Sequence, residues 1–380
     1  MEKNIVIAGY KRTPFHFAHK GALARVRPDD MGAAAVKALL DETGVDPKDI
    51  EDLIMGCAFP EGEQGYNVAR LVVNLVDLPL AVAGMTINRF CGSSMQAIHS
   101  AAGAILAGAG EVFICAGLES MTRIPMGGFN PLPNPALMET YPQAYISMGE
   151  TAENLSKAFK ISRKEQEEFA VNSHRKAAAA QADGRLDAEI VPLVTANGDT
   201  VDRDGCIRGN TTPEAIADMR PAFDKDGVVT AATSSPLTDG ASAVLVTTEE
   251  YAKAHNLEIM AKIRSMAVAG CKSELMGYGP VPATQKALER AGLTIDDIDI
   301  FDLNEAFAVQ AMTVIRELGI DEEKVNLDGG AIALGHPLGA SGARITGKAA
   351  QIMKREGKSL ALSSMCIGGG QGITTILEAA

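Results

Sequence analysis

The 380-residue sequence predicts an α/β fold built from two similar halves, on the basis of two observations. The first is an internal repeat. Residues 36–59 match residues 284–307 at a constant offset of 248, and six of the 24 aligned pairs are identical. The second is that a strand–helix–strand order recurs after each copy, which is typical of βαβ units. We therefore expect two βαβ-type halves with a parallel-rich sheet covered by helices.

Each copy of the repeat predicts a helix, a short acidic turn and a strand. Gly44 and Gly292 stand just past the two helices, where a left-handed glycine commonly ends a helix. The strands follow as DLIMGCAF in the first copy and FDLNEAF in the second. The constant offset and the shared order of elements favour a duplication over chance similarity.

A segment of different amino-acid composition separates the two halves. We expect the N-terminal half to cover residues 1–120, with a strand returning near 243–250, and the C-terminal half to cover 251–380. Residues 121–242 would form an inserted loop domain that binds substrate, because long insertions are often functional. A covering lid without specificity is the alternative. Within the insertion, Ser162 and Glu165 predict a capping box for a helix that Gly184 ends.

Composition limits the functional class and the location. The net charge of −13 argues against nucleic acid as a partner, but an anionic small ligand could still bind at a local basic patch. The six cysteines are scattered, without CxxC or metal-ligand spacing, so we expect reduced thiols. The sequence predicts no signal peptide and no transmembrane segment, and the ending ILEAA resembles no peroxisomal or lipidation signal. These features predict a cytoplasmic protein.

Three candidate catalytic residues lie in runs of small residues: Cys91 in NRFCGSSM, His336 in GGAIALGHPLGASG and Cys366 in SSMCIGGGQG. The strand AGMTIN and the helix GSSMQAIHSAAGAIL would place Cys91 at a helix N-terminus. There a thiol pKa of about 8.5 is lowered to roughly 3.5–7.5, which makes the cysteine a nucleophile. The glycines after Cys366 predict a loop of exposed N–H groups that could serve as an oxyanion hole. Taken singly, each residue could instead be structural: a core thiol, or a histidine satisfied in a turn.

Taken together, these motifs resemble the thiolase family, whose members make or break a carbon–carbon bond between acyl groups carried on coenzyme A. The resemblance covers nearly the whole chain and rests, in family order, on NRFCGSSMQA, MGETAEN, VVTAATSSPLTDGAS, NEAFA, GGAIALGHPLGASGAR and CIGGGQG. Together RSMAVAG and MGYGPVPA are most similar to bacterial 3-ketoacyl-CoA thiolases of fatty acid β-oxidation. The resemblance implies a five-layered αβαβα fold of two duplicated halves with an inserted loop domain.

The resemblance also implies a role for each candidate. Cys91 would attack the keto carbon of a 3-ketoacyl-CoA, His336 would activate it, and Cys366 would exchange a proton with the acetyl-CoA carbon. The backbone N–H groups of Cys91 and Gly368 would hold one oxyanion, and His336 with a water on Asn304 would hold the enolate. The positions that match the substrate-binding residues of the family are Met148, Arg208, Ser235, Ala306 and Phe307.

The implied reaction needs coenzyme A as a co-substrate and no metal or tightly bound cofactor. Ser147 departs from the pattern, because many acetoacetyl-CoA thiolases carry a histidine there. We therefore expect a 3-ketoacyl-CoA thiolase that forms acetyl-CoA and a shortened acyl-CoA. An acetoacetyl-CoA thiolase, condensing two acetyl-CoA, is the alternative. Ketoacyl synthases use two histidines, and Cys366 stands in place of one. A redox-sensing thiol protein is the non-enzyme alternative.

Assembly is implied only by the family. Its members are homodimers or homotetramers, and some work in a complex with other β-oxidation enzymes. We therefore expect acyl-CoA and CoA as small-molecule partners and a homo-oligomer as the working form.

Overall fold

A computed structural model describes residues 4–380, and its first half is a five-stranded sheet in the order β4-β3-β5-β8-β1. The strands are β1 (Ile5–Arg12), β3 (Ile50–Gly56), β4 (Ala83–Ile87), β5 (Val112–Ser120) and β8 (Thr238–Thr248). The short strand β2 (His16–Phe17) pairs with β8 outside this path. The second half has the order β10-β11-β12-β9, from β9 (Ala261–Gly270), β10 (Ile300–Leu303), β11 (Leu360–Ile367) and β12 (Gln371–Glu378).

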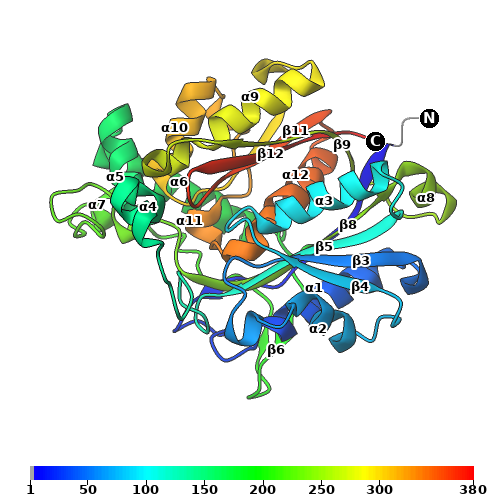
Figure 1. Ribbon diagram of the computed structural model, residues 1–380. Coiled ribbons are helices and arrows are strands. Elements are labelled where there is room, and N and C mark those ends of the chain that lie inside the picture. The colour runs from blue at the N-terminus through cyan, green and yellow to red at the C-terminus, as the bar shows by residue number, and fades with distance from the viewer. Residues whose placement is uncertain (1–3) are drawn as a thin grey trace.

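The two sheets are joined by a short seam. Strands β1 and β9 pair only at Val6 with Lys262 and at Ile7 with Ala261. Helices α3 (Ser93–Leu106) and α12 (Ser341–Arg355) pack against each other between the sheets. Helices α1 (Pro28–Thr43) and α2 (Val68–Leu75) cover the outer face of the first sheet, while α9 (Pro280–Ala291) and α10 (Ala308–Leu318) lie on the far side of the second. Figure 1 shows the resulting αβαβα layers from bottom to top.

The repeat found in the sequence is present in the structure. Helices α1 and α9 each end at a glycine in the left-handed conformation, Gly44 with φ 64° and Gly292 with φ 68°. A 3₁₀ turn follows each helix, and then comes β3 in the first half and β10 in the second. The two copies therefore share backbone conformation as well as sequence.

The expectation of a parallel-rich sheet is wrong. Along the sheet path of residues 4–380, parallel strand pairs are β3 with β4, β3 with β5, and β10 with β11. The remaining pairs along the path are antiparallel. The reason is that each βαβ unit is followed by strands that run back. For example, β12 returns beside β11 after the short turn Gly368–Gly370.

The segment between β5 and β8 contains α4 (Pro135–Thr140), α5 (Met148–Phe159), α6 (Arg163–Ala182), α7 (Pro213–Ile216) and the small hairpin of β6 (Leu193–Val194) and β7 (Thr200–Val201). Helix α6 begins with the predicted capping box of Ser162 and Glu165. The helices of this segment between β5 and β8 lie at one end of the αβαβα layers, on the left in Figure 1. There α5 and α6 pack on α10, and α6 also packs on α11 (Ala331–Leu334).

Buried ion pairs fasten this segment to both halves. Arg12 of β1 contacts Glu189 and Asp204, each at 2.7 Å, and Lys348 of α12 contacts Glu189 at 2.9 Å and Asp328 at 2.8 Å. All five side chains are buried. Breaking one partner of such a pair leaves an uncompensated charge, so these contacts hold the segment in one position.

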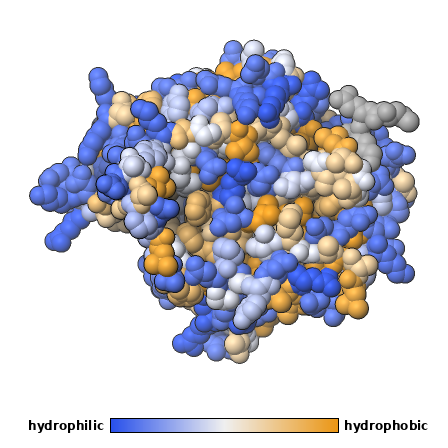
Figure 2. Space-filling view, in the orientation of Figure 1, coloured by the Kyte–Doolittle hydropathy of each residue, from blue (hydrophilic) through white to orange (hydrophobic). Residues whose placement is uncertain are grey.

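The surface is mixed in polarity (Figure 2). Within residues 4–380, no helix is long and apolar enough to cross a membrane.

Candidate active site

Cys91 lies on a tight turn between β4 and α3. Phe90, just before it, has a φ of 43°, a left-handed value uncommon for a residue with a side chain. Ser93 stabilises the turn, because its hydroxyl donates to the carbonyl of Phe90 at 2.6 Å and accepts from the N–H of Arg89 at 2.9 Å. Gly56 lets α3 approach β3 closely, since a Cβ there would lie 2.3 Å from the backbone N of Ser94. Cys91 is thus positioned by the packing of α3 on β3 and by the turn that Ser93 stabilises.

The predicted lowering of the Cys91 pKa is wrong for the free protein. Burial raises the pKa of the Cys91 thiol to about 12, and the charge of Glu119 adds to the rise. Hydrogen bonds from the N–H groups of Gly368 and of Cys91 itself act in the opposite direction. Desolvation outweighs the helix start because the side chain of Cys91 is buried. Cys91 is therefore held as a neutral thiol, with two amides directed at its sulfur.

His336 follows α11 and faces Cys91 from the second half. Its Nδ1 lies 2.5 Å from the hydroxyl of Ser341, which donates to the carbonyl of Pro337 at 2.9 Å. A hydroxyl has one hydrogen, so Ser341 accepts from Nδ1–H and leaves the lone pair of the imidazole on Nε2. Burial, followed by the charge of Arg344, lowers the pKa of His336 to about 3. His336 is therefore a neutral base with Nε2 available.

Asn304 lies beside this base, directly after β10. Its Nδ2 is 3.4 Å from Nε2 of His336, and its backbone N–H donates to Ser364 at 2.9 Å. Its side-chain Oδ1 is buried and has no hydrogen-bond partner among residues 4–380. An unsatisfied buried acceptor of this kind suits a bound water.

Cys366 is fully buried on β11, where it pairs with Gly372 of β12. Burial raises the pKa of Cys366 well above its usual value, and the proximity of Cys91 adds to the rise. The site therefore holds two neutral thiols close to one neutral imidazole.

A cavity of about 590 Å³ connects these groups, and Cys91, His336 and Cys366 all line it. So do all five positions predicted to bind substrate, namely Met148, Arg208, Ser235, Ala306 and Phe307. Asn304 and Gly368 are not among the lining residues and reach the site through His336 and Cys91. Among residues 4–380, no group of three or more His, Cys, Asp or Glu side chains is arranged to hold a metal ion.

Ser147, which departs from the acetoacetyl pattern, also lines the cavity. It is the N-cap of α5, and its hydroxyl lies 2.7 Å from the carboxylate of Glu150 within a capping box. The hydroxyl is therefore occupied by the helix end. Because the serine side chain is short and is bonded to the end of α5, it takes up little of the cavity at this position.

Sequence reasoning missed Glu119, at the end of β5. Its carboxylate accepts from the N–H of Ala58 at 2.8 Å, of Phe59 at 3.3 Å and of Gly339 at 2.9 Å. It thereby connects the loop after β3 to the loop of His336. The only indication of Glu119 in the sequence was a glutamate within the apolar strand VFICAGLES. A carboxylate that is buried in such a strand needs hydrogen-bond partners. Ser341 was also missed, although it lies within the quoted His336 motif.

Comparison with known proteins shows the family of this chain. Residues 5–250 match the model of the thiolase N-terminal domain, and residues 257–379 match that of the thiolase C-terminal domain. The chain belongs to the thiolase family. The 3-ketoacyl-CoA thiolase of Marinobacter nauticus is 50% identical over 386 residues, covering 99% of this chain and 98% of that one. The 3-ketoacyl-CoA thiolase of Bacillus subtilis is 47% identical over the full length of both.

Solved thiolase structures share the fold. The crystal structure of human mitochondrial 3-ketoacyl-CoA thiolase matches with a TM-score of 0.91 at 37% identity, covering 100% of this chain and 99% of that one. The same human enzyme in complex with CoA matches equally well, with a TM-score of 0.91 and 98% of that chain covered. The predicted five-layered thiolase fold is therefore confirmed.

Proposed function

We propose that this thiolase cleaves 3-ketoacyl-CoA with CoA, giving acetyl-CoA and a shortened acyl-CoA, in fatty acid β-oxidation. The observation that carries the proposal is the shared cavity of Cys91, His336 and Cys366, with the amides of Cys91 and Gly368 directed at the nucleophilic sulfur. Relatives named 3-ketoacyl-CoA thiolase, at 47–50% identity over nearly the whole chain, support the choice of reaction.

In the first half-reaction, Nε2 of His336 takes the proton of Cys91, and the thiolate attacks the C3 carbonyl. The resulting oxyanion accepts hydrogen bonds from the N–H groups of Cys91 and Gly368. Collapse breaks the C2–C3 bond and leaves an acyl group on Cys91. The departing enolate is stabilised by the protonated His336, with a water on Asn304, and its C2 carbon takes the proton of Cys366 to become acetyl-CoA.

In the second half-reaction, the thiolate of Cys366 takes the proton of an incoming CoA thiol. The CoA thiolate attacks the acyl-cysteine, and the departing Cys91 recovers its proton from His336. All three side chains return to their neutral state, so each turnover leaves the protein unchanged. The order of events requires ping-pong kinetics.

The proposal is tested by a rate profile across 3-ketoacyl-CoA chain lengths in the thiolysis direction. We expect acetyl-CoA to form from acyl chains longer than acetoacetyl. Activity with acetoacetyl-CoA alone would favour the second candidate, an acetoacetyl-CoA thiolase condensing two acetyl-CoA. No acetyl-CoA from any substrate would overturn thiolysis altogether, and turnover retained in Cys91→Ser would overturn the assigned nucleophile.

The role of Cys366 is tested separately. We expect Cys366→Ala to lower the rate of carbon–carbon cleavage by about 100-fold or more, the usual range for loss of a general acid. Cys115→Ala, at a buried thiol of β5 that does not line the cavity, is the matched control. Equal rates of acetyl-CoA formation in the two variants would refute the acid role.

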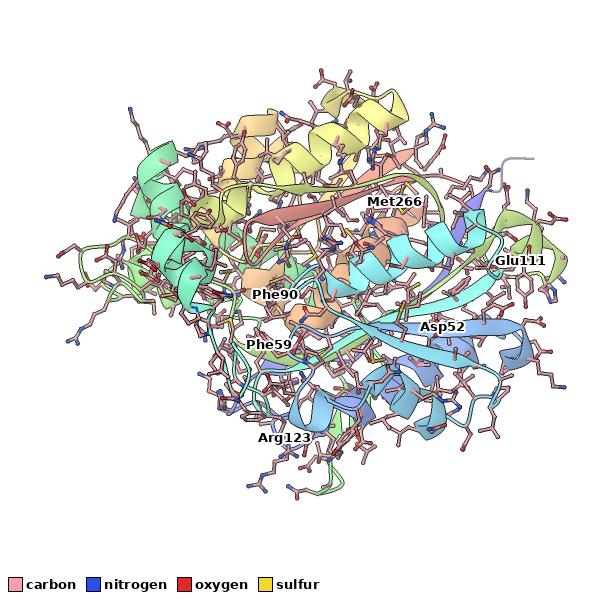
Figure 3. All side chains as sticks on the ribbon, in the orientation of Figure 1. Asp52, Phe59, Phe90, Glu111, Arg123 and Met266 are labelled. Carbon is pink, nitrogen blue, oxygen red and sulfur yellow. The ribbon has the colours of Figure 1, made fainter. Side chains whose placement is uncertain are left out.

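We also propose that the protein acts in the cytoplasm as a homodimer or homotetramer, an assembly that could in turn join other β-oxidation enzymes, with CoA as co-substrate and no tightly bound cofactor. Strand β4 supports an oligomer because it forms one edge of the sheet and is largely accessible, with Met85 39% exposed. Phe90 is also exposed and lies close to Phe59, with ring centroids 5.9 Å apart (Figure 3). Sedimentation of the purified protein measures its assembly, and a monomer at micromolar concentration would contradict the proposal.

A further inference from the structure

We infer that Glu119 is a positioning residue for the transfer of the proton from Cys91 to His336. The inference rests on the proposed function and concerns a side chain that does not line the substrate cavity. Glu119 lies near the end of β5 and is buried. Its carboxylate is bonded to one loop of each half of the protein, and each loop leads to one of the two reacting residues.

The carboxylate of Glu119 has two N–H donors on each oxygen. Oε2 accepts from the backbone N–H of Ala58 at 2.8 Å and from that of Gly339 at 2.9 Å. Oε1 accepts from Nε2 of Gln64 at 2.7 Å and from the backbone N–H of Phe59 at 3.3 Å. A carboxyl proton would find no acceptor among these four groups, so the side chain is bound as the carboxylate.

The first connection leads from Glu119 to the turn of Cys91. The carbonyl of Ala58, whose N–H donates to Glu119, accepts from Nδ2 of Asn88 at 2.9 Å. Oδ1 of Asn88 in turn accepts from the N–H of Phe90 at 2.8 Å. Phe90 has the left-handed φ of 43° and directly precedes Cys91. A continuous chain of hydrogen bonds therefore holds the strained turn of the nucleophile to the carboxylate.

The second connection leads from Glu119 to the turn that holds His336. Gly339, whose N–H donates to Glu119, lies two residues before Ser341. The hydroxyl of Ser341 lies 2.5 Å from Nδ1 of His336. The turn also packs on β5, because a Cβ at Gly117 would lie 2.1 Å from the carbonyl oxygen of Gly339. The carboxylate therefore fixes the turn that orients the base.

The two connections belong to different halves of the protein, so the spacing of Cys91 and His336 depends on contacts between the halves. Proton transfer needs donor and acceptor atoms within hydrogen-bond reach, about 2.6–3.2 Å. A misplacement of about 1 Å can lower a rate by about 100-fold. Because Glu119 does not line the cavity, its loss should lower kcat and leave KM nearly unchanged.

The test compares Glu119→Gln and Glu119→Asp with wild type in the thiolysis assay. Glutamine keeps the length of the side chain, but its NH2 group faces one of the two pairs of N–H donors. Aspartate keeps the charge but is one methylene shorter and cannot reach both loops. We expect each variant to lower kcat by about 10- to 100-fold, with little change in KM for CoA.

Two results of this comparison would overturn the inference. A wild-type kcat in Glu119→Asp would show that the charge matters and the span does not. A rise in KM without a fall in kcat would show that the residue serves binding. Both results leave the proposed function intact, because wild-type turnover is measured in the same assay. Absence of wild-type turnover would instead remove the proposed function itself.

A double-variant cycle with Ser341→Ala separates positioning from a general loss of stability. If Glu119 acts through the turn of Ser341, both substitutions release the same imidazole. The fall in kcat of the double variant should then be smaller than the product of the two single falls. A fall equal to that product would contradict the inference.

Glu153→Gln is the matched control. Glu153 is another buried glutamate that accepts from backbone N–H groups, those of Val228 and Val229, and it does not line the cavity. We expect its kcat to stay near that of wild type. An equal fall in kcat in Glu153→Gln and Glu119→Gln would show that any disturbed buried glutamate slows the enzyme, which would refute a specific role.

Asn88→Ala keeps the inference testable if the Glu119 variants do not fold. Asn88 is exposed, so its truncation disturbs no buried group, yet it breaks the chain of hydrogen bonds between Ala58 and Phe90. We expect Asn88→Ala to lower kcat by about three- to tenfold, as the loss of one hydrogen bond would. An unchanged kcat in this variant would overturn the inference.

Discussion

At the scale of single residues, Cys91 and His336 are both uncharged in the free protein. Burial raises the pKa of Cys91 to about 12 and lowers that of His336 to about 3. Across the neutral range, the thiol therefore keeps its proton and the imidazole keeps its lone pair. In the proposed mechanism, an ion pair forms only when the proton moves from Cys91 to His336, and the two amides are already in place for the substrate oxyanion. The buried thiol is thereby protected from oxidation between turnovers, because the thiolate is the reactive form.

Ser341 sets which nitrogen of His336 is the base, so its loss should slow turnover. We expect Ser341→Ala to lower kcat by about 10- to 100-fold, because the imidazole can then adopt the tautomer with its proton on Nε2. The measurement is the pH profile of kcat, which should also change shape if the ionisation of His336 is altered. Ser100→Ala, on α3 and outside the cavity lining, is the control. A kcat and profile equal to those of wild type would contradict the role of Ser341.

The sequence could indicate which candidate residues the fold brings to one cavity, but it could not indicate their ionisation. The motifs around Cys91, His336 and Cys366 are local, and small residues beside a thiol or imidazole are visible in one line of sequence. The pKa of Cys91 depends instead on burial by distant segments and on Glu119.

At the scale of elements, the duplication gives matched positions at which the same substitution can be compared. Gly44 and Gly292 both end a helix with positive φ, and a Cβ added at either position would meet no neighbouring atom within 4 Å. Any cost of a side chain there is therefore due to backbone strain alone.

We expect Gly44→Ala and Gly292→Ala each to lower the free energy of unfolding by about 1 kcal/mol. Gly103→Ala is the control, because Gly103 lies inside α3, has ordinary helical φ and also has open space around it. There alanine should raise the free energy of unfolding by roughly 0.5–1 kcal/mol. Urea unfolding measures all three variants, and a destabilised Gly103→Ala would contradict this account.

The elements of the repeat were predictable because their signals are short-range: a glycine stop, an acidic turn and an apolar strand. The direction of the later strands was not. Whether a strand such as β12 runs back beside β11 depends on the turn Gly368–Gly370, and the sequence of that turn also suits a loop that binds an oxyanion.

At the scale of the whole molecule, buried neutral histidines connect stability to pH. The pKa of His336 is lowered to about 3 and that of His174 to about 4, in both cases mainly by burial. The unfolded chain would bind protons at these residues below about pH 6.5, whereas the folded chain would not. Their contribution is complete above that pH and is lost as the pH falls towards the folded values.

We therefore expect the free energy of unfolding to fall by about 1.4 kcal/mol per pH unit for each such histidine between about pH 6 and 4. Urea unfolding at several pH values measures the slope, and His336→Gln should make it shallower by the share of one histidine. A variant with the slope of wild type would show that His336 does not remain neutral in the fold.

Gly56 has a consequence for the number of sites in the molecule. In the repeat it occupies the position of Asn304, so the two residues stand at equivalent places, at or directly after the end of β3 and of β10. At Gly56, however, a Cβ would lie 2.3 Å from the backbone of α3, the helix that presents Cys91. Glycine at the first position lets α3 pack closely against β3 beside Cys91, whereas the second position places the amide of Asn304 beside His336. The two positions of the repeat are therefore not interchangeable, and the reaction centre that we propose is a single asymmetric one and not a pair related by the duplication.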